Sequence, residues 1–380
     1  MKKNKVIPIL LSMMVFFTGC FSINKTESEN LSELKHNVEI YQTITTEENL
    51  KQETNRDTNK NTKNEDITKE VDIELTFLGD CILATNKDSN YYDCFRDVAN
   101  KEQPSYFFEK VKHVLDNDSF TIANLECVLS DSDIVPVYKD YSPAFWFKGP
   151  TKNVDMLTEG SIEVVSLSNN HTYDYGKQGI EDTKKALNDS GIKYGNEEQI
   201  VYLEEHGFKI ALICHGLWWE GQSNQIIKLI EEASLKSDYQ IVMFHGGEQG
   251  LHTPEEWKKR ECKKIVDGGA DLIIGSHPHV LQPLDRYKDV DIAYSIGNFV
   301  YGGHHAPENA TVIIKHNIKL ELSYLNNEIT NTKYISNQTN ALPTYVYSGD
   351  KNNWQPCLME EGSEDYIKTN ELLYSLQKNS

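Results

Sequence analysis

Apolar and polar positions follow two different periods along this chain, and together these periods predict alternating strands and helices. Short apolar runs suited to buried strands lie at 75–79, 120–125, 162–167, 208–214, 239–244, 272–274 and 290–296. Amphipathic helical patterns occupy 178–190, 222–236 and 253–267, and Gly191 follows the first of them, where helices commonly end. We therefore predict an α/β fold in which helices cover a sheet.

A different pattern begins at residue 311. From 311 to 334, strand-like residues alternate on both sides of the turn Asn326-Asn327-Glu328, which predicts an antiparallel hairpin at the edge of the sheet. Beyond residue 342 the periodic signal fades. We place the folded domain at 71–340 and treat 341–380 as a C-terminal extension, either an appended cap or a loose tail.

The beginning of the chain predicts export and anchoring. A basic start is followed by an apolar run at 6–17 that is too short to span a membrane, which is typical of a signal peptide covering 1–19. Cys20 follows a glycine as in a bacterial lipobox, although Phe17 stands where an aliphatic residue is usual. We expect a lipidated Cys20 on the extracellular face of the bacterial cell membrane, with plain secretion as the alternative. The polar composition of 20–70 predicts a disordered tether.

The net charge narrows the classes of possible partner, and the cysteine spacing argues against a zinc ribbon. The formal net charge of −20 at pH 7 argues against nucleic acid, because neutralising phosphates requires a basic face. An anionic polymer is then an awkward ligand unless bound cations or a local basic patch offset the repulsion. Of the seven cysteines, six remain after Cys20, and they match no zinc-ribbon spacing. We assign no disulfide pairing.

Side chains able to bind a metal follow five of the predicted strands. They are Asp80, Glu126, Asn170, His245, His277 and His279. In a layered α/β protein the carboxyl ends of the strands form the ligand-binding rim, so these groups can converge. One such histidine alone would more often be structural, but the joint placement predicts a metal site. This mixture of carboxylate, amide and imidazole suits a divalent transition metal, Mn, Fe or Zn, and not Ca.

Short polar motifs carry a resemblance to a known family. In chain order, within 73–313, they are Gly79-Asp80, Asn124-Leu125-Glu126, Ser168-Asn-Asn-His171 with Asp174-Tyr-Gly176, His245-Gly-Gly-Glu248, Gly275-Ser-His277-Pro-His279 and Ser295-Ile-Gly-Asn298-Phe. Together they resemble the CapA family of capsule-synthesis proteins, named for poly-γ-glutamate capsule biosynthesis. Such proteins are similar to calcineurin-like metallophosphoesterases, so the resemblance implies a four-layer α-β-β-α sandwich with a two-metal site between the sheets.

The resemblance also implies roles for individual residues. Glu126 stands at the place of the bridging aspartate, and the Asn170 amide oxygen matches a metal ligand. His171 resembles the general acid or phosphate-polarising group, and we take His171 and Asp174 as the candidate catalytic residues. His245, His277 and His279 match the remaining histidine ligands. The chain departs from the superfamily's opening Asp-x-His motif, because Ile82 stands where the histidine is expected.

Three functions agree with these features. The first is a lipid-anchored, metal-dependent hydrolase or transferase of capsule assembly, acting on a phosphoester, amide or ester during release or transfer of an anionic surface polymer such as poly-γ-glutamate. The second is a non-catalytic polymer-binding or export component that works with a membrane polymer synthase. The third is a general extracellular phosphoesterase, which the departure at Ile82 disfavours.

Overall fold

The computed structural model describes residues 67–89, 91–303 and 307–376. The predicted signal peptide, Cys20 and nearly all of the predicted tether lie outside these residues. Within the described ranges, no helix is both long enough and apolar enough to cross a membrane. Residues 64–380 group into one compact unit by their contacts.

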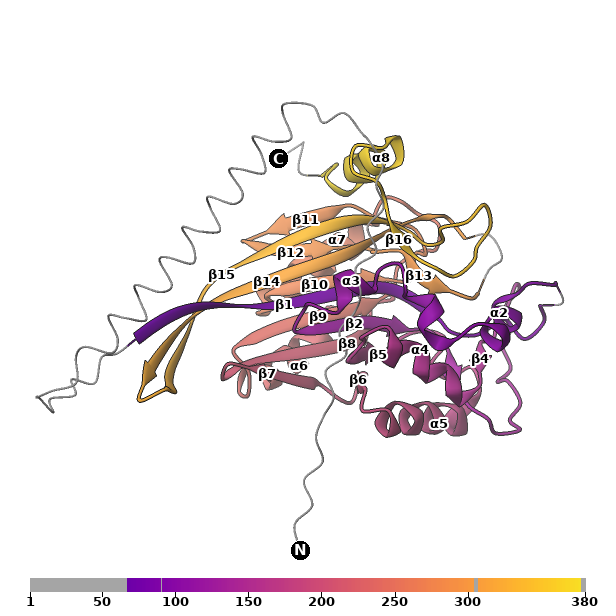
Figure 1. The fold of residues 1–380 in the computed structure, drawn as a ribbon, viewed down its shortest axis with the longest axis horizontal. Coiled ribbons are helices and arrows are strands. Elements are labelled where there is room, and N and C mark those ends of the chain that lie inside the picture. Colours follow the sequence, from indigo (N-terminus) through magenta and orange to yellow (C-terminus); the bar gives the residue numbers. More distant parts are fainter. Residues whose placement is uncertain (1–66, 90, 304–306, 377–380) are drawn as a thin grey trace, which may run out of the picture. The chain divides into compact units, whose positions relative to one another are not determined.

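The first sheet combines parallel strands with a long antiparallel hairpin. Its strands are β1 (Ile67–Ile82), β2 (Phe120–Leu125), β5 (Val164–Ser166), β6 (Lys193–Gly195), β13 (Asn298–Tyr301), β14 (Ala310–Leu325), β15 (Glu328–Tyr345) and β16 (Cys357–Leu358). The order is β16-β15-β14-β1-β2-β5-β6, and β13 pairs with β1 outside this path. Strands β1, β2, β5 and β6 are parallel, whereas β14 runs antiparallel to β1 and β15, as Figure 1 shows.

The second sheet is mostly parallel. It contains β7 (Val201–Glu205), β8 (Phe208–Gly216), β9 (Tyr239–His245), β10 (Leu272–Ser276), β11 (Leu284–Tyr287) and β12 (Val290–Ala293), in the order β11-β12-β10-β9-β8-β7. Strands β8, β9, β10 and β12 are parallel to one another. A separate short pair, β3 (Val128–Leu129) and β4 (Lys148–Gly149), lies beside the first sheet's helices.

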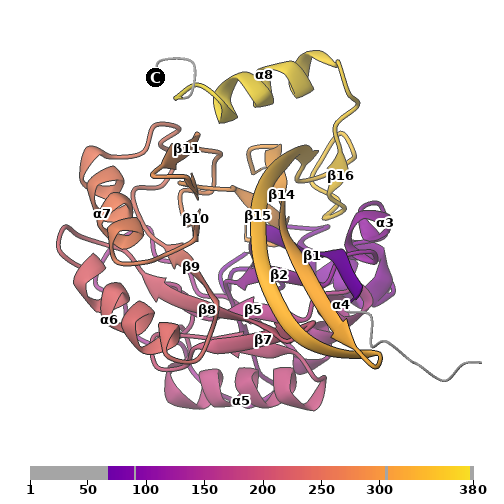
Figure 2. The same cartoon turned by 90° about the vertical axis from the view of Figure 1, so that its left-hand side faces the viewer.

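Most helices cover the outer faces of the two sheets, whereas the C-terminal helix packs Leu373 against the core between them. The helices are α2 (Phe95–Lys101), α3 (Lys112–Leu115), α4 (Val154–Glu159), α5 (Gly176–Asp189), α6 (Ser223–Ser234), α7 (Glu256–Asp267) and α8 (Glu364–Leu373), with short 3₁₀ turns at Pro104–Phe107 and Thr151–Asn153. Figure 2 shows α6 and α7 on one side of the strands and α3 and α4 on the other.

Alternation along the strands produces this layering. Successive side chains of a strand point to opposite faces, so Ile210 and Ile241 pack into the core between the sheets while Ile213 and Val242 pack under α6 and α7. The first sheet behaves in the same way, with Phe77 facing the second sheet. The predicted four-layer α-β-β-α sandwich is thereby confirmed.

Regular structure continues past the predicted C-terminal boundary at residue 340. The hairpin is confirmed, with Asn326 and Asn327 at φ 54° and 69° in its turn, but β15 runs through residue 340 to Tyr345. Strand β16 then pairs with β15, and Trp354 packs edge-on against Phe95 at a ring separation of 6.0 Å. The described part of the C-terminal extension is therefore sheet and core. At the other end, β1 begins at residue 67, four residues before the predicted start at 71.

Candidate metal centre

Carboxyl ends of strands from both sheets meet at one place, and the six predicted ligands gather there. They are Asp80 in β1, Glu126 after β2, Asn170 after β5, His245 at the end of β9, and His277 and His279 after β10. Asp80, Glu126, His245 and His277 are themselves buried. The sandwich therefore unites side chains from five strands that are far apart in the sequence.

Backbone conformation at two points sets the directions of these side chains. At Gly79, a Cβ atom would lie 2.1 Å from the carbonyl oxygen of Gly297, so only glycine allows this approach. The next residue, Asp80, donates its backbone N–H to that carbonyl at 3.0 Å. His277 and His279 have φ values of 98° and 59°, a region that L-residues rarely adopt. Such strain typically persists at sites where a side chain must be aimed.

Two groups of potential ligands share one carboxylate. Asp80, Glu126 and His279 offer atoms that all lie within 4.8 Å of one another, and Glu126, His245 and His277 do the same. The Asn170 Oδ1 atom lies 2.7 Å from His245 Nε2 and so joins the second group. Glu126 is thus the carboxylate that belongs to both groups.

Glu126 supplies a structural test of whether a cation fits. Its side chain is fully buried, and neither carboxylate oxygen has a hydrogen-bond partner among the described residues. The surrounding nitrogen atoms are close without being bonded to it, at 3.4 Å for His245 Nε2 and 3.9 Å for His171 Nε2. An unsatisfied buried carboxylate is costly, and a divalent ion would satisfy both oxygens. The donor set and this orphaned group therefore fit a metal centre.

The electrostatic character of the site favours positive charge. Burial acts to raise the pKa of Asp80, but the hydrogen bond from His279 and the charges of His245 and His279 outweigh it, and this pKa falls to about 2. Burial acts to lower the pKa of His279, but the carboxylates of Glu126 and Asp80 raise it to about 9. For His277, burial and the two neighbouring imidazoles lower the pKa to about 2. His277 is accordingly a neutral imidazole, which is the form that binds a metal.

The predicted catalytic residues form a pair beside this cluster. His171 Nδ1 lies 2.8 Å from Asp174 Oδ2, so the carboxylate orients the ring while Nε2 faces Glu126. The Asp174 side chain is fully buried, and Lys139 Nζ lies 2.6 Å from its Oδ1 atom. Asp174 also accepts the backbone N–H of Phe147 at 2.8 Å. Asp174 therefore contacts His171 from behind and does not line the cavity.

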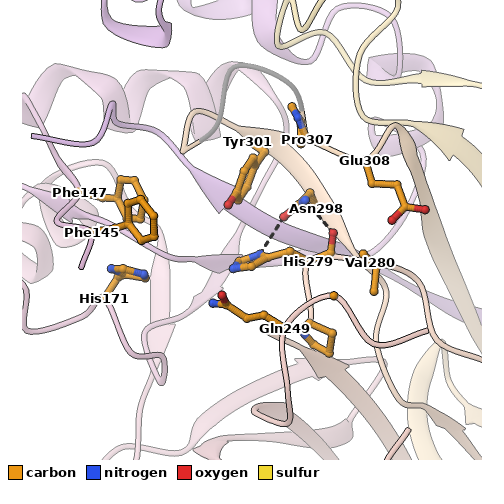
Figure 3. Close-up of a pocket in the computed structure, with 12 residues that line it drawn as sticks. Phe145, Phe147, His171, Gln249, His279, Val280, Asn298, Tyr301, Pro307 and Glu308 are labelled. Carbon is orange, nitrogen blue, oxygen red and sulfur yellow. Dashed lines mark hydrogen bonds between the residues drawn. The ribbon is translucent and has the colours of Figure 1, made fainter. Parts of the chain in front are cut away.

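A cavity of about 300 Å³ opens over the site. Figure 3 shows His171 and His279 facing it from opposite sides, with the aromatic rings of Phe145, Phe147 and Tyr301 around them. The Tyr301 ring packs on His279 with ring centroids 5.2 Å apart. The Asn298 Oδ1 atom lies 3.0 Å from His279 Nδ1, and Asn298 Nδ2 donates to the His279 carbonyl at 3.0 Å. These two contacts fix the orientation of the His279 side chain.

The structure also shows the departure from the Asp-x-His motif that the sequence indicated. Ile82 is fully buried in the apolar cluster on the outer side of the first sheet, and its register partner on β13 is Tyr301. Sequence reasoning missed Tyr301 and Lys139. The only signal for Tyr301 was its position shortly after the Ser295-Ile-Gly-Asn298-Phe motif, and Lys139 lies in a loop with no periodic pattern.

Comparisons with known proteins agree with these motifs. The family model described as "Bacterial capsule synthesis protein PGA_cap" matches residues 74–302. The capsule biosynthesis protein CapA of Bacillus anthracis is 28% identical over 272 residues, which cover 64% of this chain and 61% of that protein. The PGA biosynthesis protein CapA of Bacillus subtilis (strain 168) is 28% identical over 272 residues, covering 65% of this chain and 68% of that protein. The chain thus spans less than two thirds of the length of the B. anthracis relative.

One solved structure is similar over a large part of the chain. The 5'-nucleotidase of Candida albicans SC5314 aligns with 81% of this chain and 58% of its own, at 11% identity and a TM-score of 0.37. The layer order described above follows from the strand pairing and the core clusters of this chain itself.

Proposed function

The chain belongs to the bacterial capsule synthesis protein family PGA_cap, and from this premise we propose that it is a metal-dependent hydrolase or transferase. Its substrate is an anionic surface polymer of the poly-γ-glutamate type, as the names of the two Bacillus relatives suggest. The proposal includes lipid anchoring through Cys20 on the extracellular face of the membrane and work beside a membrane polymer synthase.

The observation that carries this proposal is the buried, unpartnered carboxylate of Glu126, which both ligand groups share. Two divalent ions, held by Asp80, Glu126, Asn170, His245, His277 and His279, would activate water near neutral pH and polarise the scissile bond. Mn, Fe or Zn suits this mixture of oxygen and nitrogen ligands.

The residues of the chain itself perform the remaining tasks. His171 presents Nε2 toward the cavity, so it can hold or deliver a proton there. Asp174 fixes the ring direction through Nδ1, and Phe145 and Phe147 reduce the access of water to the reacting group. These residues can support proton transfer to a leaving oxygen or nitrogen, which is the step that hydrolysis and transfer share.

A second candidate function is a non-catalytic polymer-binding or export component. It is favoured by one observation, the presence of the fully buried Ile82 where an imidazole ligand would complete the first ligand group. In this case the fold is required but turnover is not.

Metal content of the full-length protein, purified without chelators, is the first test. We expect one to two equivalents of transition metal by elemental analysis, lost in Asp80→Ala and His277→Ala and kept in His113→Ala, which changes an exposed histidine. His171→Ala should keep its metal and its abundance yet abolish polymer output in a strain that depends on this protein. A folded wild type without metal, or full output from His171→Ala, would contradict catalysis and favour the scaffold.

A further inference from the structure

A second pocket lies against the wall of the site cavity. Its volume is about 140 Å³, enough for a single polymer residue. Consecutive residues divide the two spaces: Phe147 lines the site cavity, whereas Lys148 lines the second pocket. Similarly, Asp174 contacts His171, whereas Tyr175 lines the second pocket. The two spaces therefore share a wall that these short segments build.

The pocket is cationic in a chain with a strong excess of acidic residues. Lys87, Arg96 and Lys148 line it, and no carboxylate lines it among the described residues. Lys148 forms no ion pair with any described residue: its Nζ donates to the Ser132 carbonyl at 2.9 Å and lies 5.4 Å from the centroid of the Tyr175 ring. Lys87 and Arg96 pair with exposed neighbouring carboxylates at 3.1 Å and 3.7 Å, and such pairs are weak. Lys87 also lies over the Trp146 ring, and Arg96 Nη2 donates to Cys94 Sγ. Three cations are thus available to a ligand carboxylate.

A buried hydrogen-bond acceptor in this pocket indicates that its ligand carries an N–H donor as well as negative charge. Asn153 lines the pocket at 2% exposure, and its Oδ1 atom has no hydrogen-bond partner among the described residues. The amide orientation is set by Nδ2, which donates to the Leu83 carbonyl at 2.8 Å, since a flipped amide would place two acceptors together. A buried acceptor without a donor requires an explanation, and an N–H group of a ligand would satisfy it.

We propose that this pocket binds one residue of an acidic polyamide, with Lys87, Arg96 and Lys148 holding its carboxylate and Asn153 accepting its amide N–H. This inference rests on the proposed polymer substrate and adds the place where the chain beyond the reacting residue is held. Phosphate-rich and purely polycarboxylate polymers carry the negative charge but have no amide N–H that Asn153 could accept. The basic patch also removes the difficulty that the net charge of −20 poses for an anionic ligand.

The test measures binding separately from turnover. Calorimetric titration of the full-length protein with a short γ-glutamyl oligomer, in the presence of EDTA, reports affinity without hydrolysis. The Lys87→Gln/Arg96→Gln double variant and Lys148→Gln should each bind roughly tenfold more weakly, because each loses charge-assisted hydrogen bonds. Lys148→Arg should recover most of the affinity. The matched control is Lys368→Gln, which changes an exposed lysine paired with Glu364 in α8 and lines no part of this pocket.

Each outcome decides the proposal. Weaker binding in both variants with an unchanged control supports it, and unchanged binding in the exposed Lys87→Gln/Arg96→Gln variant overturns it even if Lys148→Gln misfolds. A wild type that does not bind the oligomer, or that binds polyacrylate equally well, also overturns it, since polyacrylate has carboxylates but no amide. Metal content and polymer output of the same variants report on the proposed function independently.

Discussion

Glu126 is the single side chain on which both ligand groups depend. If its carboxylate bridges two ions, removing the charge with Glu126→Gln should abolish metal-dependent stabilisation at nearly constant volume. An ion present at a hundredfold excess over its Kd stabilises the fold by about 2.7 kcal/mol. We therefore expect EDTA to lower the melting temperature of the wild type by roughly 4 °C for each ion removed. The variant should melt at the same temperature with and without EDTA.

The matched control for this substitution is Glu261→Gln. Glu261 is also fully buried, but Ser223 Oγ donates to it at 2.6 Å and Lys264 pairs with it at 2.7 Å. Its replacement should lower stability while leaving the EDTA effect intact. A Glu126→Gln protein that still responds to EDTA like the wild type would refute the bridging role.

Single residues differ in how far the sequence reveals them. Asp80, Glu126 and His245 were predictable because each ends or follows an apolar run, and parallel strands bring their carboxyl ends together. Lys139 and Asn153 have no such signal, since both lie in irregular segments whose positions depend on tertiary contacts. The partition of roles between His171 and Asp174 also needed the structure, because both side chains are buried and only the position of the cavity distinguishes the group that faces it from the one behind.

The loop at 130–147 between β3 and β4 is held over the site by one buried ion pair. Lys139 Nζ contacts Asp174 and donates to the Phe145 carbonyl at 2.7 Å, and the Val137 N–H donates to the Asp174 carbonyl at 2.8 Å. Lys139→Met should leave the Asp174 charge buried without its partner, which costs about 3 to 5 kcal/mol. Urea unfolding should show this loss, and chymotrypsin should cleave at Tyr138 and Tyr141 faster than in the wild type.

Lys87→Met provides the comparison for this loop. Lys87 lies over the same Trp146 ring as Lys139, at 5.4 Å against 5.6 Å, but it is exposed to solvent. Its replacement should change the free energy of unfolding by no more than about 0.5 kcal/mol. Equal effects of the two substitutions would show that the ion pair contributes nothing beyond the cation's contact with the ring.

Helices and strands whose apolar residues repeat with a clear period were predictable from the sequence. The C-terminal part of the fold, which has no such period, was not. The helices observed at Gly176–Asp189 and Ser223–Ser234 lie within about two residues of the predicted ranges, because their apolar faces repeat every three to four residues. Alternation predicted strand β15 only as far as residue 334, because the polar run at 336–340 hides the continuation of the strand to Tyr345. The segment after it has no period at all, and Trp354 is buried by contacts from distant elements.

Trp354 tests whether the C-terminal segment belongs to the core. It is 2% exposed in the cluster beneath the outer helices of the first sheet, so Trp354→Ala should lower the free energy of unfolding by about 3 to 5 kcal/mol. Trp219, which is 58% exposed, is the control, and its replacement by alanine should have an effect within about 0.5 kcal/mol. Urea unfolding of both variants measures the difference, and a small effect at Trp354 would restore the interpretation of a loose tail.

At the scale of the whole molecule, stability depends on the core between the two sheets. This layer is apolar apart from a few polar contacts, and His316 on β14 makes one of them. Its Nε2 atom lies 2.9 Å from the Tyr239 hydroxyl of β9, and its Nδ1 atom lies 2.8 Å from the Thr339 hydroxyl of β15. His316 therefore joins the first sheet to the second while remaining fully buried.

Burial lowers the pKa of His316 from 6.5 to about 4, and this shift links folding to pH. Between these values the unfolded chain binds a proton that the folded chain does not, so the stabilising contribution is complete above pH 6.5 and is lost as the pH falls toward 4. At about 1.4 kcal/mol per pH unit, the loss amounts to about 3 kcal/mol. Asp271 acts in the opposite direction, because burial raises its pKa to about 6 and the folded chain then binds the extra proton.

The His316→Gln variant separates these opposing contributions. Position 316 pairs with Leu75 of β1, five residues before Asp80 and thus roughly 16 Å from it along the strand, so the metal centre should titrate alike in both proteins. Urea unfolding in EDTA between pH 4 and pH 7 should show the free-energy difference between wild type and variant shrinking by about 3 kcal/mol as the pH falls. A difference independent of pH would mean that the folded core accepts a charged imidazole, and that the contact between the sheets is hydrated.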